Sequence, residues 1–185
     1  MRKIPDNAKK VFGGIIYDVY QWEQQLFDGS KALFEKLKRP DTVIIIPAVE
    51  GRILIVREEQ PGEAKVQSLA GGRVEKGEEP FQTAKRELLE ETGYVSKDWD
   101  LFKVYHPLHK IEWDVYVYIA RNCEKRAEQH LDPGERIETV LLDFDEFVEA
   151  VSSEHFHANE LARDILRLRL DQRNLDAFRM KLFPR

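Results

Sequence analysis

Residues Gly71–Val95 carry the sequence GGRVEKGEEPFQTAKRELLEETGYV. This segment predicts a helix from Pro80 to Thr92, because proline suits the first turn of a helix and Gly93 suits its C-terminal cap. Four residues share one stripe of this helix at 3.6 residues per turn, and we expect the stripe to pack against a sheet. These residues are Phe81, Ala84, Leu88 and Thr92.

Three glutamates of the helix, Glu87, Glu90 and Glu91, lie together beside this stripe, because side chains three and four residues apart are neighbours on a helix. Like charges at this spacing repel one another, so positive charge is required nearby. Mg²⁺ and Mn²⁺ prefer hard oxygen ligands, and the three carboxylates therefore predict a site for a divalent cation. The simpler alternative is a solvated helix face, since glutamate is common on exposed helices.

Strand patterns precede this helix. Asp28-Gly29 and Glu50-Gly51 are hairpin turn signals between apolar segments. Lys31–Lys38 is compatible with either a short helix or a returning strand. The predicted strands upstream of the helix are Gly13–Leu26, Thr42–Ala48 and Arg52–Val56.

Further strands and helices follow without strict alternation. Strands are predicted at Leu101–Tyr105, Trp113–Ile119 and Ile137–Leu142, and helices at Asp145–Val151 and Ala158–Leu170. Because strands precede, surround and follow the helices, the order indicates an α+β fold, in the form of a mixed α/β sandwich, rather than a doubly wound sheet.

The composition limits the classes of function. The 185 residues include 29 Lys and Arg against 34 Asp and Glu, a net charge of -5, which argues against a generally basic nucleic-acid binder. The single cysteine, Cys123, excludes an intrachain disulfide, and we expect a buried thiol. The polar N-terminus lacks the apolar stretch of a secretory signal, and Val43–Val49 is too short to cross a bilayer. We expect a cytoplasmic protein with no membrane and no nucleic-acid partner.

The central segment also matches a known motif. The Nudix box, Gly-x5-Glu-x7-Arg-Glu-U-x-Glu-Glu-x-Gly-U with U bulky and apolar, is satisfied at every fixed position. The chain therefore resembles the Nudix hydrolases, which cleave a nucleoside diphosphate linked to another moiety. The resemblance implies a mixed sheet between helices and a pyrophosphohydrolase activity. The matching residues are Gly72, Glu78, Arg86, Glu87, Leu88, Glu90, Glu91, Gly93 and Tyr94.

The resemblance also implies the roles of individual residues. Mg²⁺, with Mn²⁺ as the alternative, would bind Glu87, Glu90, Glu91 and the main-chain carbonyl of Gly71. Arg86 would pair with a glutamate of the box, and we group it with Glu90 and Glu91 as catalytic. Water attack on a diphosphate also requires a base. Glu135, in the segment LDPGERIET, is the candidate, with Asp132 and Glu138 as neighbours able to substitute for it.

Outside the box, the layout resembles the ADP-ribose and nucleotide-sugar pyrophosphatase branch of the family. That resemblance divides the chain into an N-terminal strand region, 1–40, which would form a homodimer, and a hydrolase domain, 41–185. Aromatic residues of the strand region would stack on the base of the substrate, with packing in the core or an interface as the simpler alternative; the candidates are Tyr17, Tyr20 and Trp22. Gln60 stands where the branch commonly has a phosphate-contacting arginine, and the candidates to replace that charge are Arg57, Arg73 and Lys110.

Two alternatives remain from the sequence. One is a Nudix-type nucleotide-binding regulatory module without catalysis, although degenerate boxes are usual in such modules and this box is intact. The other is an RNA-processing enzyme of the family, for which the acidic balance offers little support.

Overall fold

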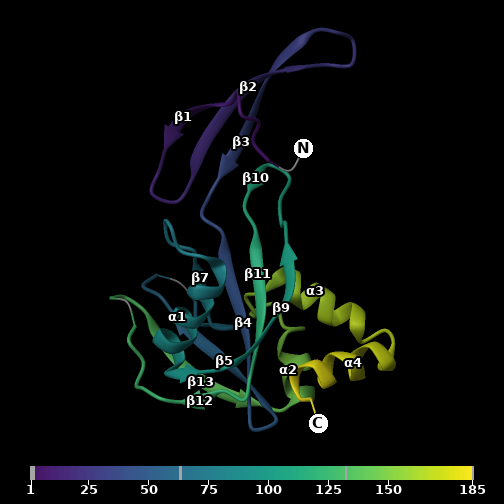
Figure 1. The fold of residues 1–185 in the computed structure, drawn as a ribbon. Helices are drawn as coiled ribbons and strands as arrows, with labels where there is room; N and C mark the ends of the chain where they lie inside the picture. Colours follow the sequence, from purple (N-terminus) through teal and green to yellow (C-terminus); the bar gives the residue numbers. More distant parts are fainter. Residues whose placement is uncertain (1–2, 63, 132, 185) are drawn as a thin grey trace.

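A mixed central sheet separates the helices into two groups, with α1 on one face and the other helices on the opposite face (Figure 1). The structure, a computed structural model, describes residues 3–62, 64–131 and 133–184. Within those residues, no helix is both long enough and apolar enough to cross a membrane. The helices are α1 (Pro80–Thr92), α2 (Phe144–Ala150), α3 (Asn159–Leu168) and α4 (Gln172–Leu182).

The central sheet has the strand order β13-β5-β4-β11-β9, with β6 paired to β5 and β7 paired to β4. β4 and β11 run parallel, whereas the other pairs of this sheet are antiparallel. One edge of β4 is shared, because its first half pairs with β7 and its end pairs with β5. The strands are β4 (Thr42–Val49), β5 (Arg52–Glu59), β6 (Val66–Ser68), β7 (Gly71–Arg73), β9 (Asp98–Tyr105), β11 (Val115–Arg121) and β13 (Arg136–Leu142).

A smaller sheet projects from the body of the molecule (Figure 1). Its strand order is β1-β2-β3-β10, and β10 joins β3 in parallel although it comes from the middle of the chain. These strands are β1 (Lys9–Gly13), β2 (Asp18–Gln25), β3 (Lys31–Lys38) and β10 (Ile111–Glu112). A separate pair consists of β8 (Tyr94–Val95) and β12 (Glu124–Lys125).

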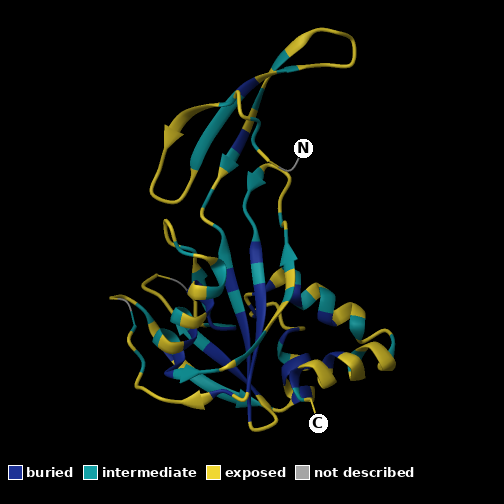
Figure 2. Cartoon of the chain, in the orientation of Figure 1, coloured by how far each residue is buried: buried dark blue, intermediate teal, exposed yellow. Residues whose placement is uncertain are grey.

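Alternate residues of β4 and β5 face two different hydrophobic clusters. The α1 cluster contains Val43, Ile45, Leu54 and Val56 together with Ala84 and Leu88 of the helix. The α2–α4 cluster contains Ile46, Ile53 and Ile55 with Phe147, Leu161, Ile165 and Phe178. Successive residues of a strand point to opposite faces of a sheet, so these two strands are buried on both sides, as Figure 2 shows.

The fold class predicted from the sequence is confirmed, and most elements lie where the patterns place them. The helix has the predicted bounds, and the turn between β4 and β5 has positive φ at both Glu50 (48°) and Gly51 (78°). The open case of Lys31–Lys38 is resolved as a strand, paired with β2 along its whole length. The buried thiol expected at Cys123 is confirmed.

Two predictions about elements are wrong. Gly13–Leu26 is not one strand, because Gly14–Tyr17 forms the turn between β1 and β2, closed by a hydrogen bond from Gly14 N to Tyr17 O of 2.9 Å. The second difference is α4, a helix that the sequence pattern does not predict, because its half-polar sequence gives only a narrow apolar stripe at Leu175, Phe178 and Leu182.

Candidate active site

The C-terminal half of α1 carries the three glutamates and is held in place at both ends. Pro80 occupies the first turn, where a missing N–H costs nothing. Gly93 caps the other end in the left-handed conformation, with φ of 76°, and its N–H donates to Leu89 O at 2.8 Å. Ala84 and Leu88 are fully buried in the α1 cluster, which leaves the glutamates on the flank beside the sheet.

The glycines of β7 allow the helix carboxylates to approach the backbone. A Cβ on Gly72 would lie 2.2 Å from Glu87 Oε1, so any other residue at this position would displace the carboxylate from where it lies. Gly71 N donates to Glu91 Oε2 at 3.0 Å. Gly71 and Gly72 of β7 thus lie directly against the carboxylates of Glu91 and Glu87.

The main-chain carbonyl of Gly71 faces the same side as its N–H. Ala70 O accepts from Ile45 N, and Val74 N donates to Asp41 O, so the hydrogen-bonded pairs with β4 fall on alternate residues around Gly71. Gly71 therefore points its N–H and its C=O away from β4, and the N–H donates to Glu91. The role of this carbonyl as a metal ligand, which the resemblance implies, stays a prediction.

Arg86 connects several carboxylates of the motif. Its Nη1 lies 2.9 Å from both Glu87 Oε1 and Glu90 Oε2, and its Nε donates to Glu78 Oε1 at 3.2 Å. Glu78 also accepts from Thr83 Oγ1 at 2.7 Å. The hydrogen bonds from Arg86 lower the pKa of Glu78. Burial opposes the charge of Arg86, but the bonds to Glu78 and Glu90 prevail and raise the pKa of its guanidinium.

Glu91 has no such compensation. Burial, reinforced by the charge of Glu87, raises the pKa of Glu91 to about 9, against the opposing hydrogen bond from Gly71 N. Burial also raises the pKa of Glu87, although Arg86 counteracts it. Among the described residues, no lysine or arginine forms an ion pair with Glu91. A partly buried carboxylate without a cation is a place where a metal ion would supply the missing charge.

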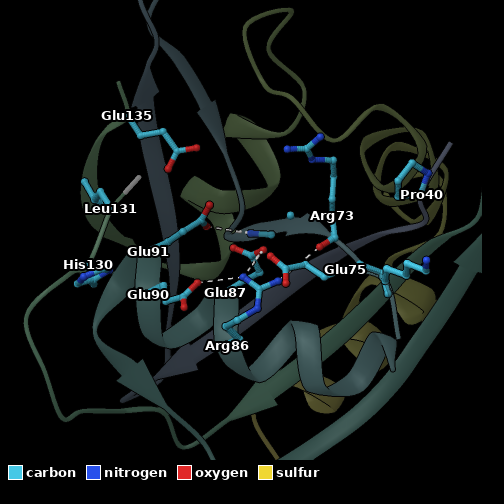
Figure 3. Close-up of a pocket in the computed structure, with 14 residues that line it drawn as sticks. Pro40, Arg73, Glu75, Arg86, Glu87, Glu90, Glu91, His130, Leu131 and Glu135 are labelled. Atoms are coloured by element: carbon cyan, nitrogen blue, oxygen red, sulfur yellow. Dashed lines mark hydrogen bonds and ion pairs between the residues drawn. The ribbon is translucent and has the colours of Figure 1, made fainter. Parts of the chain in front are cut away.

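The glutamates line a cavity of about 490 Å³, shown in Figure 3. Glu135 reaches this cavity from the segment before β13, and its charge contributes to the raised pKa values of Glu87 and Glu91. The structure thus brings together seven of the predicted site residues around one space. They are Gly71, Arg73, Arg86, Glu87, Glu90, Glu91 and Glu135.

The cavity is not preorganised as a closed metal cage. Within the part of the chain that the structure describes, no three His, Cys, Asp or Glu side chains converge with metal-binding geometry. Arg86 lies between Glu87 and Glu90, so a cation bound by both would have to displace its guanidinium. The donors nevertheless fit Mg²⁺, since all are hard oxygens and one carboxylate lacks a counter-charge.

Three predicted substrate residues lie elsewhere. Arg57 pairs with Glu138, with 3.8 Å between Nη1 and Oε1, and Gln60 donates to Glu58. Trp22 is buried in the small sheet, where its ring lies 6.0 Å from that of Phe34. None of the three lines the glutamate cavity. Of the two residues named as substitutes for Glu135, Glu138 binds Arg57 and Lys65, and Asp132 lies outside the described residues.

The cavity also contains residues that the sequence analysis did not single out. They include Glu75, Lys76, His130 and Leu131. Glu75 and Lys76 lie in the loop of the motif, so proximity to Gly72 was a usable signal. Leu131 begins the segment LDPGERIET, which the sequence indicates only through its acidic residues. His130 has no sequence signal, and only the tertiary structure places it beside α1.

A second cavity, of about 660 Å³, adjoins the first and shares Pro40 with it. Its lining includes Lys36, Lys38 and Arg39 at the end of the small sheet. The Arg39 guanidinium lies 4.4 Å from the ring centroid of Trp113, and its buried Nε has no hydrogen-bond partner. Cationic and aromatic groups thus continue from the glutamate cavity toward the small sheet.

Several known proteins are similar to this chain. A family model described as NUDIX domain matches residues 37–165. ADP-ribose pyrophosphatase of Bacillus subtilis (strain 168) is 29% identical over 168 residues, which cover 89% of this chain and 91% of that protein. Methanol dehydrogenase activator of Bacillus methanolicus is 25% identical over 170 residues, with the same two coverages. A crystal structure of ADP compounds hydrolase matches with a TM-score of 0.72 at 20% identity, covering 89% of this chain and 92% of that one, which supports the fold.

Proposed function

The chain belongs to the NUDIX family and is a pyrophosphohydrolase, and from this premise we propose that it is a Mg²⁺-dependent hydrolase of nucleoside diphosphate derivatives. It is similar to an enzyme named for ADP-ribose and is of that general type. The proposed substrate is ADP-ribose or a nucleotide sugar, cleaved at the pyrophosphate bond by water.

The observation that carries this proposal is the state of Glu91. Its carboxylate is partly buried beside Glu87, accepts one hydrogen bond from Gly71 N, and pairs with no cation of the described chain. A surface helix face would leave this glutamate in water, where its charge needs no partner. A site for a divalent cation accounts both for its position and for its missing counter-charge.

We assign Glu87, Glu90, Glu91 and the carbonyl of Gly71 as the groups that would hold Mg²⁺, with Mn²⁺ as the alternative. When bound, the cation would neutralise phosphate oxygens and acidify the attacking water. Arg73 and Lys76 line the same cavity and would add positive charge beside the diphosphate. Arg86 would keep the glutamates oriented through its bond to Glu78.

We further propose Glu135 as the base that accepts the proton of the attacking water. It lines the cavity with the helix glutamates but belongs to a different segment, so it can face the phosphate from another side. A cation held by Glu87 and Glu91 would offset the negative charge of the carboxylates gathered beside Glu135. The role of Glu135 is therefore coupled to metal binding.

The adjoining cavity supports an elongated substrate. Lys38, Arg39 and Trp113 would receive the part of the molecule beyond the diphosphate, through contacts with charge and ring faces. Contacts of the substrate with Arg57, Gln60 and Trp22 stay predictions. None of these three residues lines the glutamate cavity of its own chain.

We also propose a cytoplasmic homodimer formed through the small sheet. Phe12 (61% exposed), Ile15 (99%) and Leu33 (67%) leave large apolar surfaces uncovered there. The single buried thiol, Cys123, fits a reducing compartment in which disulfides are rare. The division at residue 40 also remains a proposal, and β10 shows that the small sheet takes in two later residues.

The test is a hydrolysis screen over ADP-ribose, nucleotide sugars, dinucleoside polyphosphates, NADH and nucleoside triphosphates, with Mg²⁺, with Mn²⁺ and with EDTA. We expect turnover of a diphosphate derivative only with a divalent cation. Glu91→Gln keeps the size of the side chain and removes its charge, so it should lower kcat by about 100-fold or more.

The matched control is Glu154→Gln, because the side chain of Glu154 is 88% exposed in a loop away from the cavity. It should leave kcat unchanged. Full activity of Glu91→Gln, or turnover in EDTA, would refute the assignment of the metal site. The alternative of a non-catalytic module is not adopted, since every glutamate of the motif is present and three of them line the cavity.

A further inference from the structure

The segment Arg126–Leu131 closes the C-terminal end of α1. The last carbonyls of a helix have no partner within the helix and must find one elsewhere. His130 N donates to Glu90 O at 2.8 Å, and Gly93 O accepts from both Arg126 N (2.8 Å) and Ala127 N (3.1 Å). The end of the helix that carries the carboxylates is thus bound by backbone from another part of the chain.

Gln129 completes this contact with its side chain. Its amide Nε2 donates to Glu91 O at 2.5 Å and to Ile137 O at 3.1 Å. A side-chain amide has two N–H donors, and Gln129 uses both. One bond goes to the helix residue that carries the uncompensated carboxylate. The other goes to the second residue of β13.

Glu135 lies two residues before Ile137, at the start of β13. The preceding residues Pro133 and Gly134 are exposed, and Gly134 has a φ of 100°. The chain thus enters Glu135 through an exposed turn, and the side chain of Glu135 lines the cavity together with the helix glutamates.

We propose that Gln129 is a positioning residue that holds Glu135 at a fixed distance from the carboxylates of α1. It acts by bonding the helix end at Glu91 and the strand start at Ile137 with one amide. The inference rests on the proposed function, in which Glu135 is the base. Gln129 does not line the cavity, so it is not proposed to touch the substrate.

The test replaces the amide by groups that cannot donate. Gln129→Leu removes both donors, and Gln129→Glu keeps the size of the side chain but turns a carboxylate toward two carbonyls. We expect each to lower kcat by about 10- to 100-fold, the range typical of residues that orient catalytic groups, with KM changed by less than about threefold. The control is Glu128→Gln, whose side chain is 93% exposed on the same segment, and it should behave as wild type.

The second arm asks whether Gln129 acts through Glu135. Glu135→Gln alone should lower kcat by about 100-fold or more, as expected for loss of a general base. The double variant Gln129→Leu/Glu135→Gln should be no slower than Glu135→Gln alone, to within about twofold, because the positioned group is already lost. Additive losses would show that Gln129 does not act through Glu135 and would overturn the proposal.

The remaining outcomes are also decisive. A kcat of Gln129→Leu and Gln129→Glu within twofold of wild type overturns the proposal, and so does failure of both variants to fold, since Gln129 would then serve the fold itself. If wild type hydrolyses none of the substrates, the proposed function fails. The proposed clamp, meaning the two hydrogen bonds from Gln129 to Glu91 O and Ile137 O, is then tested by trypsin digestion. Trypsin should cut faster after the exposed Arg126 or Arg136 in Gln129→Leu than in wild type, and equal rates would overturn the proposal.

Discussion

Glu91 is a carboxylic acid in a place where burial disfavours its charged form in the metal-free protein. Its position beside Gly71 and Glu87 places a carboxylate among protein atoms, and its pKa of about 9 means that it holds a proton at neutral pH unless a cation is bound. Gln129 and Gly71 bind this residue at its carbonyl and its carboxylate. Glu91 is therefore fixed from both sides whatever its charge.

The stability of the metal-free protein should fall as pH rises because of Glu91. Its pKa is about 9 in the folded state and about 4.5 in a free chain, so the folded state holds the extra proton between these values. The stabilisation is fully present below pH 4.5 and is lost as pH rises toward 9. The amide of Glu91→Gln does not titrate. At pH 8 the free energy of unfolding of this variant should therefore exceed that of wild type by at least about 1 kcal/mol, or about 2–4 °C in Tm.

Thermal unfolding in EDTA at pH 5 and at pH 8 measures this effect. The gap between Glu91→Gln and wild type should be clearly smaller at pH 5, and Glu154→Gln should track wild type at both values. A gap of equal size at the two pH values would mean that the carboxylate is ionised in the folded protein without a metal.

At the scale of elements, the two ends of α1 are held in different ways. Its N-cap residue, Glu79, makes no side-chain cap hydrogen bond, and the first turn is held by Pro80, by packing and by the hydrogen bond from Thr83 Oγ1 to Glu78. Gly93, by contrast, adopts a positive φ and lies against the backbone of Ala127. The helix and the segment that follows β12 are thus joined at the end of α1 that carries the carboxylates of the candidate site.

Gly93→Ala should destabilise the protein more than a glycine substitution at an open turn. A Cβ at Gly93 would lie 2.1 Å from Ala127 O, and the residue would also be strained at φ of 76°. Gly51→Ala is the matched control, with φ of 78° and no atom within 4 Å of the added Cβ. Both variants carry the cost of about 1–2 kcal/mol for the left-handed conformation.

The difference between the two variants isolates the contact with Ala127. In urea unfolding, Gly93→Ala should lose at least about 1 kcal/mol more than Gly51→Ala, since a large-for-small change in a close-packed contact displaces backbone. Equal losses would show that segment Arg126–Leu131 yields without cost. The proposed clamp at Gln129 would then be weaker than its geometry indicates.

Local chemistry made the elements of the motif predictable. Pro80 favours the first turn of a helix and Gly93 favours the left-handed conformation that ends one. The first and last residues of α1 therefore follow from the sequence without tertiary information. Lys31–Lys38 has apolar residues that satisfy both a helical and a strand pattern, and only pairing with β2 decides. α4 is stabilised by packing of Phe178 and Leu182 in the α2–α4 cluster rather than by a strong pattern of its own.

The candidate site divides in the same way. The positions of Glu87, Glu90 and Glu91 relative to one another follow from helix geometry, and the structure places Glu135 with them in one cavity. Gln129 carried no sequence signal, because its partners are main-chain carbonyls that any residues at those positions would supply. Trp22 is placed in the small sheet, and a single chain does not bring it to the glutamates.

At the scale of the whole molecule, the small sheet stands apart from the two hydrophobic clusters (Figures 1 and 2). It is attached to the body through the chain connections from β3 to β4, from β9 to β10 and from β10 to β11. β3 and β10 are joined beside these connections by their parallel pairing and by the ion pair between Lys38 and Glu112, at 2.7 Å. The exposed apolar residues on β1 and β3 are not explained by packing within one chain. A second copy of the chain would cover them.

Charge introduced on the small sheet should therefore separate the proposed dimer. Phe12→Asp combined with Leu33→Asp should shift the mass measured by light scattering from dimer to monomer, because a carboxylate in an apolar interface lacks a partner. Leu101→Asp is the control, since Leu101 is also 52% exposed but lies on β9 of the central sheet. A monomeric wild type, or a dimer that persists in the double variant, would contradict the proposal.

The alternation along β4 has a consequence for how this protein can change over evolutionary time. Val43 and Ile45 pack in the α1 cluster, whereas Ile46 packs in the α2–α4 cluster. Loss or gain of a single residue inside this strand would therefore turn the following side chains to the opposite face of the sheet and disturb both clusters at once. Length changes are thereby confined to the loops, whereas apolar residues of similar volume remain exchangeable within each cluster. Relatives of this chain should diverge in β4 by replacement and never by insertion or deletion.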